Sequence, residues 1–98
     1  IHPALLPFFG GAGMYGMRVH KAVYASGMKV SGPTVHFVNE EYDKGAILAQ
    51  RAVSIAHCCS PEEIAAEVLK AEHHLLPEVV AALAAGRIVR ENGSYRII

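Results

Sequence analysis

The feature that most constrains the fold is a long amphipathic segment that begins at Ser60. Ser60 is a good N-cap residue, Pro61 suits the first helical position, and Glu63 completes a capping box. Gly86 is the stop signal, and Pro77 predicts a kink just before it or a split into two helices. The apolar residues between these signals recur every three or four positions and predict one buried stripe, formed by Ile64, Val68, Ala71, Leu75, Val79 and Leu83.

Two strands joined by an acidic turn are expected in the middle of the chain. Residues 31–38 alternate like a strand with one polar face, which Thr34 and His36 form. Residues 39–45 read as the turn, and residues 46–55 as a second, largely apolar strand. Because the link is short, we expect the two strands to be antiparallel neighbours.

The remaining segments are shorter. Residues 16–26 predict a short helix, and residues 88–98 predict a closing hairpin that turns at Asn92-Gly93. Residues 11–16 have the glycine spacing of a dinucleotide-binding fingerprint, but Pro7 breaks the strand that must precede it. The fingerprint also requires an acidic residue about twenty positions further along the chain, and none lies there. A closely packed or flexible loop is therefore expected at residues 11–16.

Composition excludes several classes of protein. The 98 residues suit one domain, and 52% of them are apolar, which is typical of a globular chain and not of a disordered one. Nine basic residues balance nine acidic ones, so there is no electrostatic reason to expect nucleic acid or a membrane surface as partner. The apolar runs are too short to span a bilayer.

The start of the chain and its cysteines bear on location. The first residues have no basic or long apolar region, so no signal peptide is predicted, and the lack of an initiator Met indicates a fragment. Cys58 and Cys59 are adjacent and cannot form an ordinary disulfide. A reducing, cytoplasmic setting is the simplest expectation.

The cysteines also fail as a metal centre. His57, Cys58 and Cys59 are consecutive, and no paired Cys or His elsewhere completes a tetrahedral set, so no metal is expected. His73 and His74 lie in the middle of the long helix and face different sides, which is the usual situation of solvated histidines.

Four other side chains are candidates for chemistry, and each has an ordinary alternative. Glu72 borders the buried stripe, but a surface glutamate is the commoner situation on such a helix. His2 and His36 suit acid–base work, yet a single histidine is more often structural. Asp43 precedes Lys-Gly, which is also ordinary turn chemistry. The residues taken one by one leave these alternatives open.

Read together, several motifs resemble the phosphoribosylglycinamide formyltransferases over nearly the whole chain. They are Ile-His-Pro-Ala-Leu-Leu-Pro at 1–7, Ser-Gly-Pro-Thr-Val-His-Phe-Val at 31–38, and Asp-Lys-Gly-Ala-Ile-Leu-Ala-Gln at 43–50. Glu72-His73 and Pro77 fit the same pattern, and residues 10–23 resemble one bacterial branch of the family. The first motif alone is shared with methionyl-tRNA formyltransferase and formyltetrahydrofolate hydrolase.

The resemblance implies an α/β chain that forms the C-terminal part of a Rossmann-like formyltransferase fold. The family transfers a formyl group from 10-formyltetrahydrofolate to the amine of glycinamide ribonucleotide. His2 and Asp43 would be catalytic, and His36 would support the aspartate. Ile1, Pro3 and Glu72 would contact the nucleotide. The folate pocket would be lined by Val38, Asn39, Glu40, Glu41, Tyr42 and Asp43.

The chain also departs from the family pattern. The Asn that precedes Ile-His-Pro in the family is absent, and so is the N-terminal nucleotide-binding half. We therefore expect residues 1–98 to form a single C-terminal unit that is poorly active alone. It would expose the apolar face against which the missing N-terminal half packs, and it could associate with itself through that face. Two alternatives stay open, namely a related folate formyltransferase or hydrolase, and a non-catalytic remnant that acts as a binding or oligomerisation module.

Overall fold

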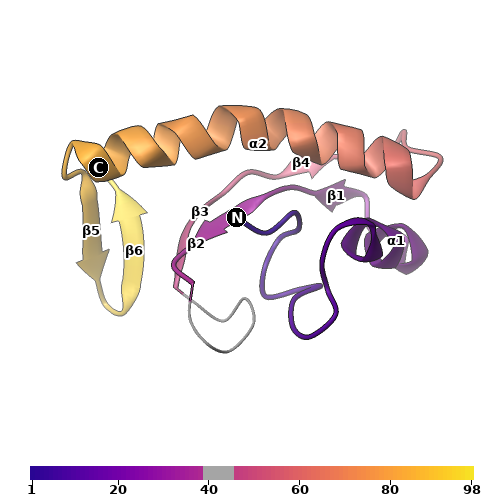
Figure 1. Cartoon of the computed structure of the whole chain (residues 1–98), viewed down its shortest axis with the longest axis horizontal. Coiled ribbons are helices and arrows are strands. Elements are labelled where there is room, and N and C mark those ends of the chain that lie inside the picture. The colour runs from indigo at the N-terminus through magenta and orange to yellow at the C-terminus, as the bar shows by residue number, and fades with distance from the viewer. Residues whose placement is uncertain (39–45) are drawn as a thin grey trace.

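The computed structural model describes residues 1–38 and 46–98, and its longest element is helix α2, Pro61–Ala84. Figure 1 shows α2 lying along one side of the strands, with helix α1, Met17–Ser26, near its N-terminal end. A hairpin of β5, Ile88–Glu91, and β6, Ser94–Ile97, follows its C-terminal end. The α/β architecture expected from the sequence is confirmed.

The start of α2 is capped much as predicted. The Ser60 hydroxyl accepts a hydrogen bond from Glu63 N at 3.2 Å, and Pro61 opens the first turn. The Glu63 carboxylate turns back to accept from Cys59 N, one residue before the cap, where a standard capping box uses the N–H of the cap itself. This bond ties the preceding loop to the helix.

The body of α2 differs from expectation in two places. The helix continues through Pro77 as one element, so the predicted split into two helices is wrong. The buried stripe ends at Ala82, which is fully buried, whereas Leu83 is 47% exposed. The step of three residues from Val79 to Ala82 keeps the average spacing of the stripe near 3.6 residues. Leu83 lies four residues after Val79, and this spacing turns it out of the buried face.

The predicted pair of long strands is present as two short pairs. Strand β2, Thr34–His36, runs antiparallel to β3, Ile47–Gln50, and β1, Val30–Ser31, runs antiparallel to β4, Val53–Ser54. The antiparallel arrangement is therefore confirmed. The expected continuous strands are wrong, because each is interrupted between its two short pieces.

Gly32 explains where the first strand breaks. Its φ is +146°, and a Cβ at this position would lie 1.8 Å from the carbonyl oxygen of Arg51. Only glycine permits the two chain segments to approach this closely. Arg51 N donates to the carbonyl of Pro33 at 3.2 Å, so the crossing still holds a backbone hydrogen bond.

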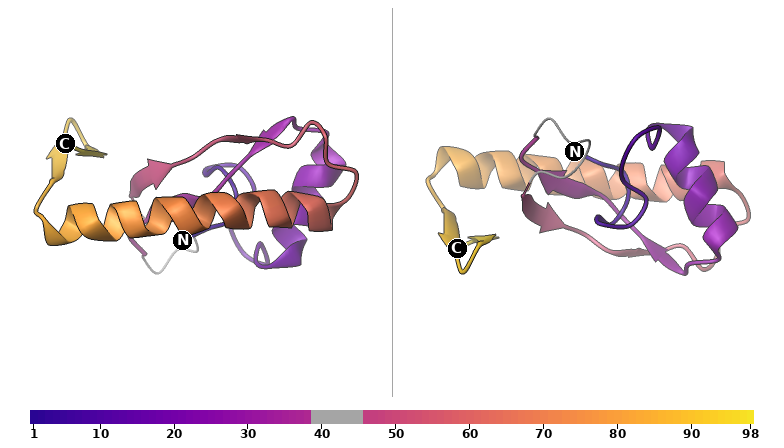
Figure 2. Two further views of the ribbon diagram at one scale, coloured as in Figure 1. Left: turned by 90° about the horizontal axis from the view of Figure 1, so that it is seen from above. Right: turned by 90° about the horizontal axis from the view of Figure 1, so that it is seen from below.

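Two clusters of buried side chains form the core, and α2 contributes to both. Its N-terminal half packs with α1 and the first residues of the chain, in the cluster Ala4, Val19, Val23, Ile55, Ile64 and Val68. Its C-terminal half packs on β2 and β3, in the cluster Val35, Leu48, Leu75 and Val79. One face of α2 thus fixes the position of the strands relative to α1 (Figure 2).

The C-terminal hairpin has the predicted turn. Asn92 and Gly93 have φ of 51° and 80°, as a two-residue hairpin turn with positive φ at both positions requires. The hairpin is attached to the strands by an edge-to-face contact between Tyr95 and Phe37, whose ring centroids are 5.1 Å apart. Neither described helix has the length and apolar character needed to cross a membrane.

Candidate active site

The first residues of the chain add a short extra rung to the sheet. His2 N donates to Thr34 O and Thr34 N donates to His2 O, both at 2.8 Å, so His2 pairs with β2 from outside the named strands. His2 is 3% exposed. Pro3 follows directly and limits the backbone freedom beside it. The imidazole is therefore presented from a fixed backbone.

The Thr34 hydroxyl holds the next residues in place. It donates to Ala4 O at 2.7 Å and accepts from Leu6 N at 3.1 Å. Gln50 Nε2 donates both to this hydroxyl at 3.0 Å and to Leu6 O at 2.8 Å. A segment with little regular structure of its own is thus bonded to two strands through the Thr34 hydroxyl and the Gln50 side-chain amide.

The His2 side chain borders a cavity of about 470 Å³. Its Nε2 lies 2.8 Å from the carbonyl oxygen of Phe9, and since a carbonyl only accepts, this nitrogen carries the proton. One wall of the cavity is the Ile1-His2-Pro3 motif, and the other is the glycine loop, through Gly11, Gly13, Met14, Tyr15 and Gly16. The loop that the sequence indicated was only a packed or flexible connection therefore lines this cavity.

A second cavity, of about 250 Å³, lies between the two helices. Its lining residues are Gly16, Met17, His20, Ala65, Val68, Leu69 and Glu72. Glu72 is half-buried there, which agrees with its expected place at the border of the buried stripe. Gly16 lines both cavities, so the two adjoin.

His20 is a polar residue of this region that the sequence reasoning missed. It is 6% exposed, and burial, with the nearby His2 as a smaller cause, lowers the pKa of its imidazole from the ordinary 6.5. Its position next to Val19 and three residues before Val23 puts it on the buried face of α1, and that spacing was the available signal.

The other predicted site residues are placed less completely. His36 is buried in β2, and its Nδ1 lies 3.0 Å from the Phe37 carbonyl oxygen, so that nitrogen donates. Val38 is 80% exposed. The catalytic prediction for Asp43 and the folate predictions for Asn39, Glu40, Glu41 and Tyr42 lie outside the described residues. The structure therefore leaves those roles as predictions.

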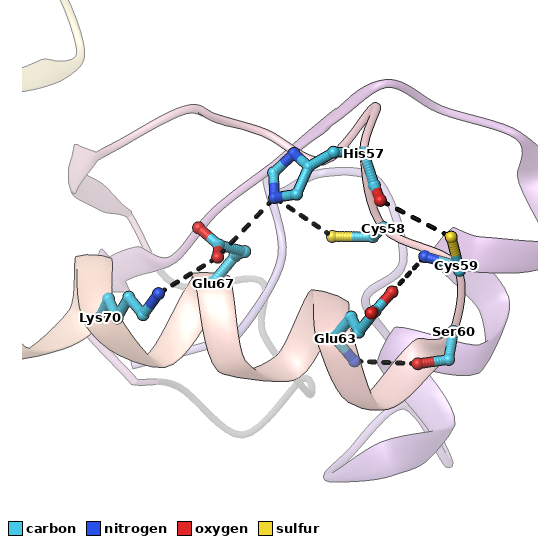
Figure 3. Close-up of polar contacts among 7 residues, drawn as sticks. All are labelled: His57, Cys58, Cys59, Ser60, Glu63, Glu67 and Lys70. Carbon is cyan, nitrogen blue, oxygen red and sulfur yellow. Dashed lines mark hydrogen bonds and ion pairs between the residues drawn. The ribbon is translucent and has the colours of Figure 1, made fainter.

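The consecutive His57, Cys58 and Cys59 join a polar network at the start of α2 (Figure 3). His57 Nε2 lies 3.9 Å from the Cys58 sulfur and 3.7 Å from a Glu67 carboxylate oxygen, whereas the Cys59 sulfur contacts the His57 carbonyl oxygen at 3.7 Å. In the described part of the chain, no three His, Cys, Asp or Glu side chains are grouped so that they could hold a metal ion.

The chemistry of Cys58 fits a structural position. Desolvation of its thiol, followed by the negative charges of Glu63 and Glu67 and the neighbouring Cys59, raises the pKa of Cys58 above its ordinary value. Its side chain also packs against the first core cluster. A thiol with a raised pKa is a poor nucleophile at neutral pH, so Cys58 is not a candidate for covalent chemistry.

Comparison with known proteins decides the family. A family model described as formyl transferase matches residues 1–80. The chain belongs to the formyl transferase family. This family uses formyltetrahydrofolate as its formyl donor.

Individual relatives of this formyl transferase chain are similar over nearly all of its length. It is 61% identical over 94 residues to the chloroplastic phosphoribosylglycinamide formyltransferase of Arabidopsis thaliana, covering 95% of this chain and 32% of that protein. The chloroplastic enzyme of Vigna unguiculata is also 61% identical over 94 residues, with 95% and 30% covered. The chain thus spans about a third of the length of these two relatives.

Solved structures of the family share the fold. Glycinamide ribonucleotide transformylase 1 from Symbiobacterium toebii superposes with a TM-score of 0.84 at 36% identity, covering 99% of this chain and 43% of that one. A formyltetrahydrofolate deformylase from Pseudomonas syringae gives a TM-score of 0.83 at 27% identity, covering 99% and 31%. The predicted membership of a formyltransferase fold is confirmed.

One prediction about this formyl transferase chain is contradicted. The adjacent cysteines led to an expected cytoplasmic setting, but the three plant relatives, from Arabidopsis thaliana, Vigna unguiculata and Glycine max, are all chloroplastic enzymes by name. Reduced cysteines indicate a reducing environment without identifying the compartment, which is why the sequence led to the wrong expectation.

Proposed function

We propose that this chain forms part of a phosphoribosylglycinamide formyltransferase, which transfers a formyl group from 10-formyltetrahydrofolate to the amine of glycinamide ribonucleotide in de novo purine biosynthesis. The observation that carries the proposal is the cavity of about 470 Å³ bordered by Ile1, His2 and Pro3. The 61% identity to plant enzymes of that name supports the choice of substrate.

His2 is proposed to stabilise the oxyanion of the reaction. When the substrate amine attacks the formyl carbon, the carbonyl oxygen gains negative charge, and a positioned N–H donor stabilises it. The contact between His2 Nε2–H and Phe9 O already uses one donor. The imidazolium form carries a positive charge, so the charged ring is the form suited to this role.

Asp43 is proposed to move the proton. Collapse of the intermediate breaks the bond between the formyl carbon and N10 of the folate. N10 gains a proton while the attacking amine loses one, so the transfer is balanced without any further reactant. A carboxylate can carry this proton directly or through water. The role of Asp43 comes from the family resemblance of residues 43–50, and His36 is proposed to support it.

The nucleotide is proposed to contact Ile1, Pro3 and Glu72, and the folate to contact residues 38–43. Ile1 and Pro3 border the larger cavity, and Glu72 lines the adjoining one between the helices. A single ligand that passes Gly16 would touch both sets of residues. This continuity supports the proposed substrate path.

A second candidate is hydrolysis of formyltetrahydrofolate, because the deformylase structure shares the fold with a TM-score of 0.83. Its 27% identity is lower than the 36% identity of the glycinamide ribonucleotide transformylase structure. The two activities differ in the acceptor, water or an amine. Assay of formate release and of formylated nucleotide in the same reaction therefore distinguishes them.

The decisive experiment measures formyl transfer by the naturally expressed protein and its His2→Ala and Asp43→Asn variants. We expect each variant to lose at least 100-fold in kcat, by analogy with removal of an oxyanion donor or of a general base. The exposed His74 offers a control, since His74→Ala should leave kcat unchanged. Transfer that persists unchanged in both site variants would overturn the assignment.

Two further expectations concern context. The 98 residues cover 32% of the Arabidopsis thaliana relative, so we expect the isolated chain to transfer formyl groups poorly. Assay of the isolated chain beside a complete family enzyme tests this, and near-equal rates would contradict it.

By similarity to the chloroplastic relatives, the protein is proposed to work in a plastid, which organelle fractionation with antibody detection tests.

Self-association is the remaining proposal about partners. Beside its buried stripe, α2 exposes a second row of apolar side chains, formed by Leu69, Leu76, Val80 and Leu83. An exposed apolar face of this kind favours association. Sedimentation of the isolated chain over a range of concentrations tests it, and a monomer at all concentrations would refute self-association.

A further inference from the structure

Arg18, in the first turn of α1, carries a positive charge that no carboxylate of the described residues neutralises. Its side chain is exposed and makes no ion pair within residues 1–38 and 46–98. The sequence up to residue 39 contains Arg18, Lys21 and Lys29 but no Asp or Glu. This part of the chain therefore has only positive formal charge, and Arg18 is available to an anion from solution.

The guanidinium group of Arg18 lies beside the cavity at His2. Its Cζ is 5.2 Å from the centroid of the Tyr15 ring, which is a cation–π contact. Its Nη1 would be 3.7 Å from a Cβ atom added to Gly13. Tyr15 and Gly13 both line the cavity of about 470 Å³. The guanidinium group is thus held at the rim of this cavity.

Other arginines of the chain have an ordinary explanation that Arg18 lacks. Arg51 forms an ion pair with Glu78 at 2.8 Å, and Arg96 forms one with Glu91 at 2.9 Å. Arg18 instead packs on a residue of the cavity wall, and Arg18 N also donates to Tyr15 O at 3.2 Å. Both its backbone and its side chain therefore place the charge near the proposed site.

A guanidinium group in this position suits an oxyanion. Its parallel N–H donors match the two oxygens of a carboxylate or of a phosphate. Both proposed substrates carry such a group, since the nucleotide has a phosphate monoester and the folate ends in a glutamate with two carboxylates. A cavity of about 470 Å³ has the size of sites that bury most of a small molecule. A ligand whose reacting end lies at His2 therefore extends to the rim.

We propose that Arg18 is a substrate-binding residue whose guanidinium group binds an oxyanionic group, carboxylate or phosphate, at the rim of the His2 cavity. The inference rests on the proposed function and adds Arg18 to its site. Because Arg18 is exposed, its attraction for the anion is screened by salt. Binding through Arg18 therefore depends on ionic strength.

The test is equilibrium binding by calorimetry to the naturally expressed protein, with two intact and two truncated ligands. The first pair is glycinamide ribonucleotide and its riboside, which lacks the phosphate. The second is 10-formyltetrahydrofolate and its pteroylamide analogue, in which an amide replaces the glutamate. Arg18→Gln should weaken binding of one intact ligand about tenfold, the lower range for a hydrogen bond to a charged group, because the site is exposed.

The truncated ligands identify the anion. Arg18→Gln should leave the affinity for the truncated form of the affected ligand unchanged, because the group that Arg18 binds is missing there. A loss confined to the ribonucleotide assigns the phosphate, and a loss confined to the folate assigns the glutamate carboxylates. The difference between wild type and Arg18→Gln should also shrink when ionic strength rises from about 0.05 M to about 0.5 M.

Two further variants serve as controls. Arg18→Lys keeps the charge but loses the paired donors, so its loss of affinity should be smaller, about threefold. Lys29→Gln removes one positive charge from an exposed residue that lines neither cavity, and it should bind every ligand like the wild type. Thermal unfolding of each variant confirms that it folds.

The outcomes separate this inference from the proposed function. Unchanged affinity for both intact ligands in Arg18→Gln would overturn the inference alone. Equal losses for an intact ligand and its truncated form would do the same, because they would show a structural effect. An equal loss in Lys29→Gln would also overturn it, by showing an effect of net charge. Failure of the wild type to bind either intact ligand would overturn the proposed function, and the inference with it.

Discussion

His2 and Thr34 exchange two backbone hydrogen bonds of 2.8 Å each, and both residues are almost completely buried. This pair joins the first residues of the chain to the strand that carries His36. The Thr34 hydroxyl then bonds to Ala4 and Leu6 beyond the pair. The orientation of His2 thus depends on a threonine that itself lies outside both cavities.

Replacing Thr34 with valine is expected to destabilise the fold by about 2–4 kcal/mol. The substitution keeps the shape but leaves Leu6 N and Ala4 O buried without their partner, and each such group costs about 1–3 kcal/mol. Urea unfolding measures the change. Thr34→Ser keeps the hydroxyl and should cost only about 1 kcal/mol, for the lost methyl group. Equal losses in the two variants would show that the hydroxyl does not hold this segment.

Gly32→Ala should be among the most damaging single substitutions in the chain. The added Cβ would meet the Arg51 carbonyl oxygen at 1.8 Å, so the crossing of the two strand segments would have to open. We expect a loss of more than about 4 kcal/mol in unfolding free energy, or failure to fold.

Gly27→Ala is the matched control for that strain. Gly27 also has positive φ, +75°, but nothing lies within 4 Å of its added Cβ. Its replacement should cost only about 1–2 kcal/mol, for the left-handed backbone conformation. Comparable losses at the two glycines would refute the close approach at Gly32.

His20 should make the protein less stable in mild acid. Its pKa is lowered in the folded state through burial and the nearby His2, so the unfolded chain binds the proton more tightly. The stability that comes from neutral His20 is complete above pH 6.5, its ordinary pKa, and is lost as the pH falls below that value. Glu72 lines the same cavity from α2.

Urea unfolding between pH 7.5 and 5 tests this dependence. In His20→Asn, the decrease in unfolding free energy toward low pH should be shallower than in the wild type, by up to one proton. His74→Asn, at an exposed position on α2, should keep the wild-type slope. A wild-type slope in His20→Asn would contradict the lowered pKa.

Cys58 should react slowly with alkylating reagents. Because burial of the thiol and the carboxylates of Glu63 and Glu67 raise its pKa, the pH midpoint of its reaction with iodoacetamide should lie above that of an unperturbed thiol. Each variant also carries Cys59→Ser, so that the measured alkylation rate is that of Cys58 alone. Glu67→Gln should lower the midpoint. Glu62→Gln should leave it unchanged, because Glu62, although also in α2, is not one of the groups that raise the pKa of Cys58. An unchanged midpoint in Glu67→Gln would remove that carboxylate from the explanation.

Local sequence signals predicted most of the secondary structure. The cap at Ser60, the turn at Asn92-Gly93 and the short helix over residues 16–26 are read from neighbouring residues, and all three are confirmed in the structure. The errors arose where distant residues decide. Leu83 continued an apparent stripe that the true helical period leaves, and the strand break at Gly32 depends on Arg51, far along the chain.

The candidate site divides in the same way. The motif around His2 and the helix position of Glu72 could be selected from the sequence, because residue type and spacing carry that information. The glycine loop as a cavity wall could not, since its spacing matched a different and unsuitable motif. His20 was missed because a histidine on an apolar helix face gives no local sign that its Nδ1 lacks a hydrogen-bond partner among the described residues.

The sequence by itself determined the capped helix α2, the closing hairpin and the motifs that place the chain among formyl transferases, because each rests on short-range spacing. Only the tertiary structure decided that His2 pairs with Thr34 and that His20 and Glu72 face one cavity. Those relationships join segments far apart in the chain. They form when the two core clusters pack on α2, and burial then fixes which polar atoms remain available to a ligand.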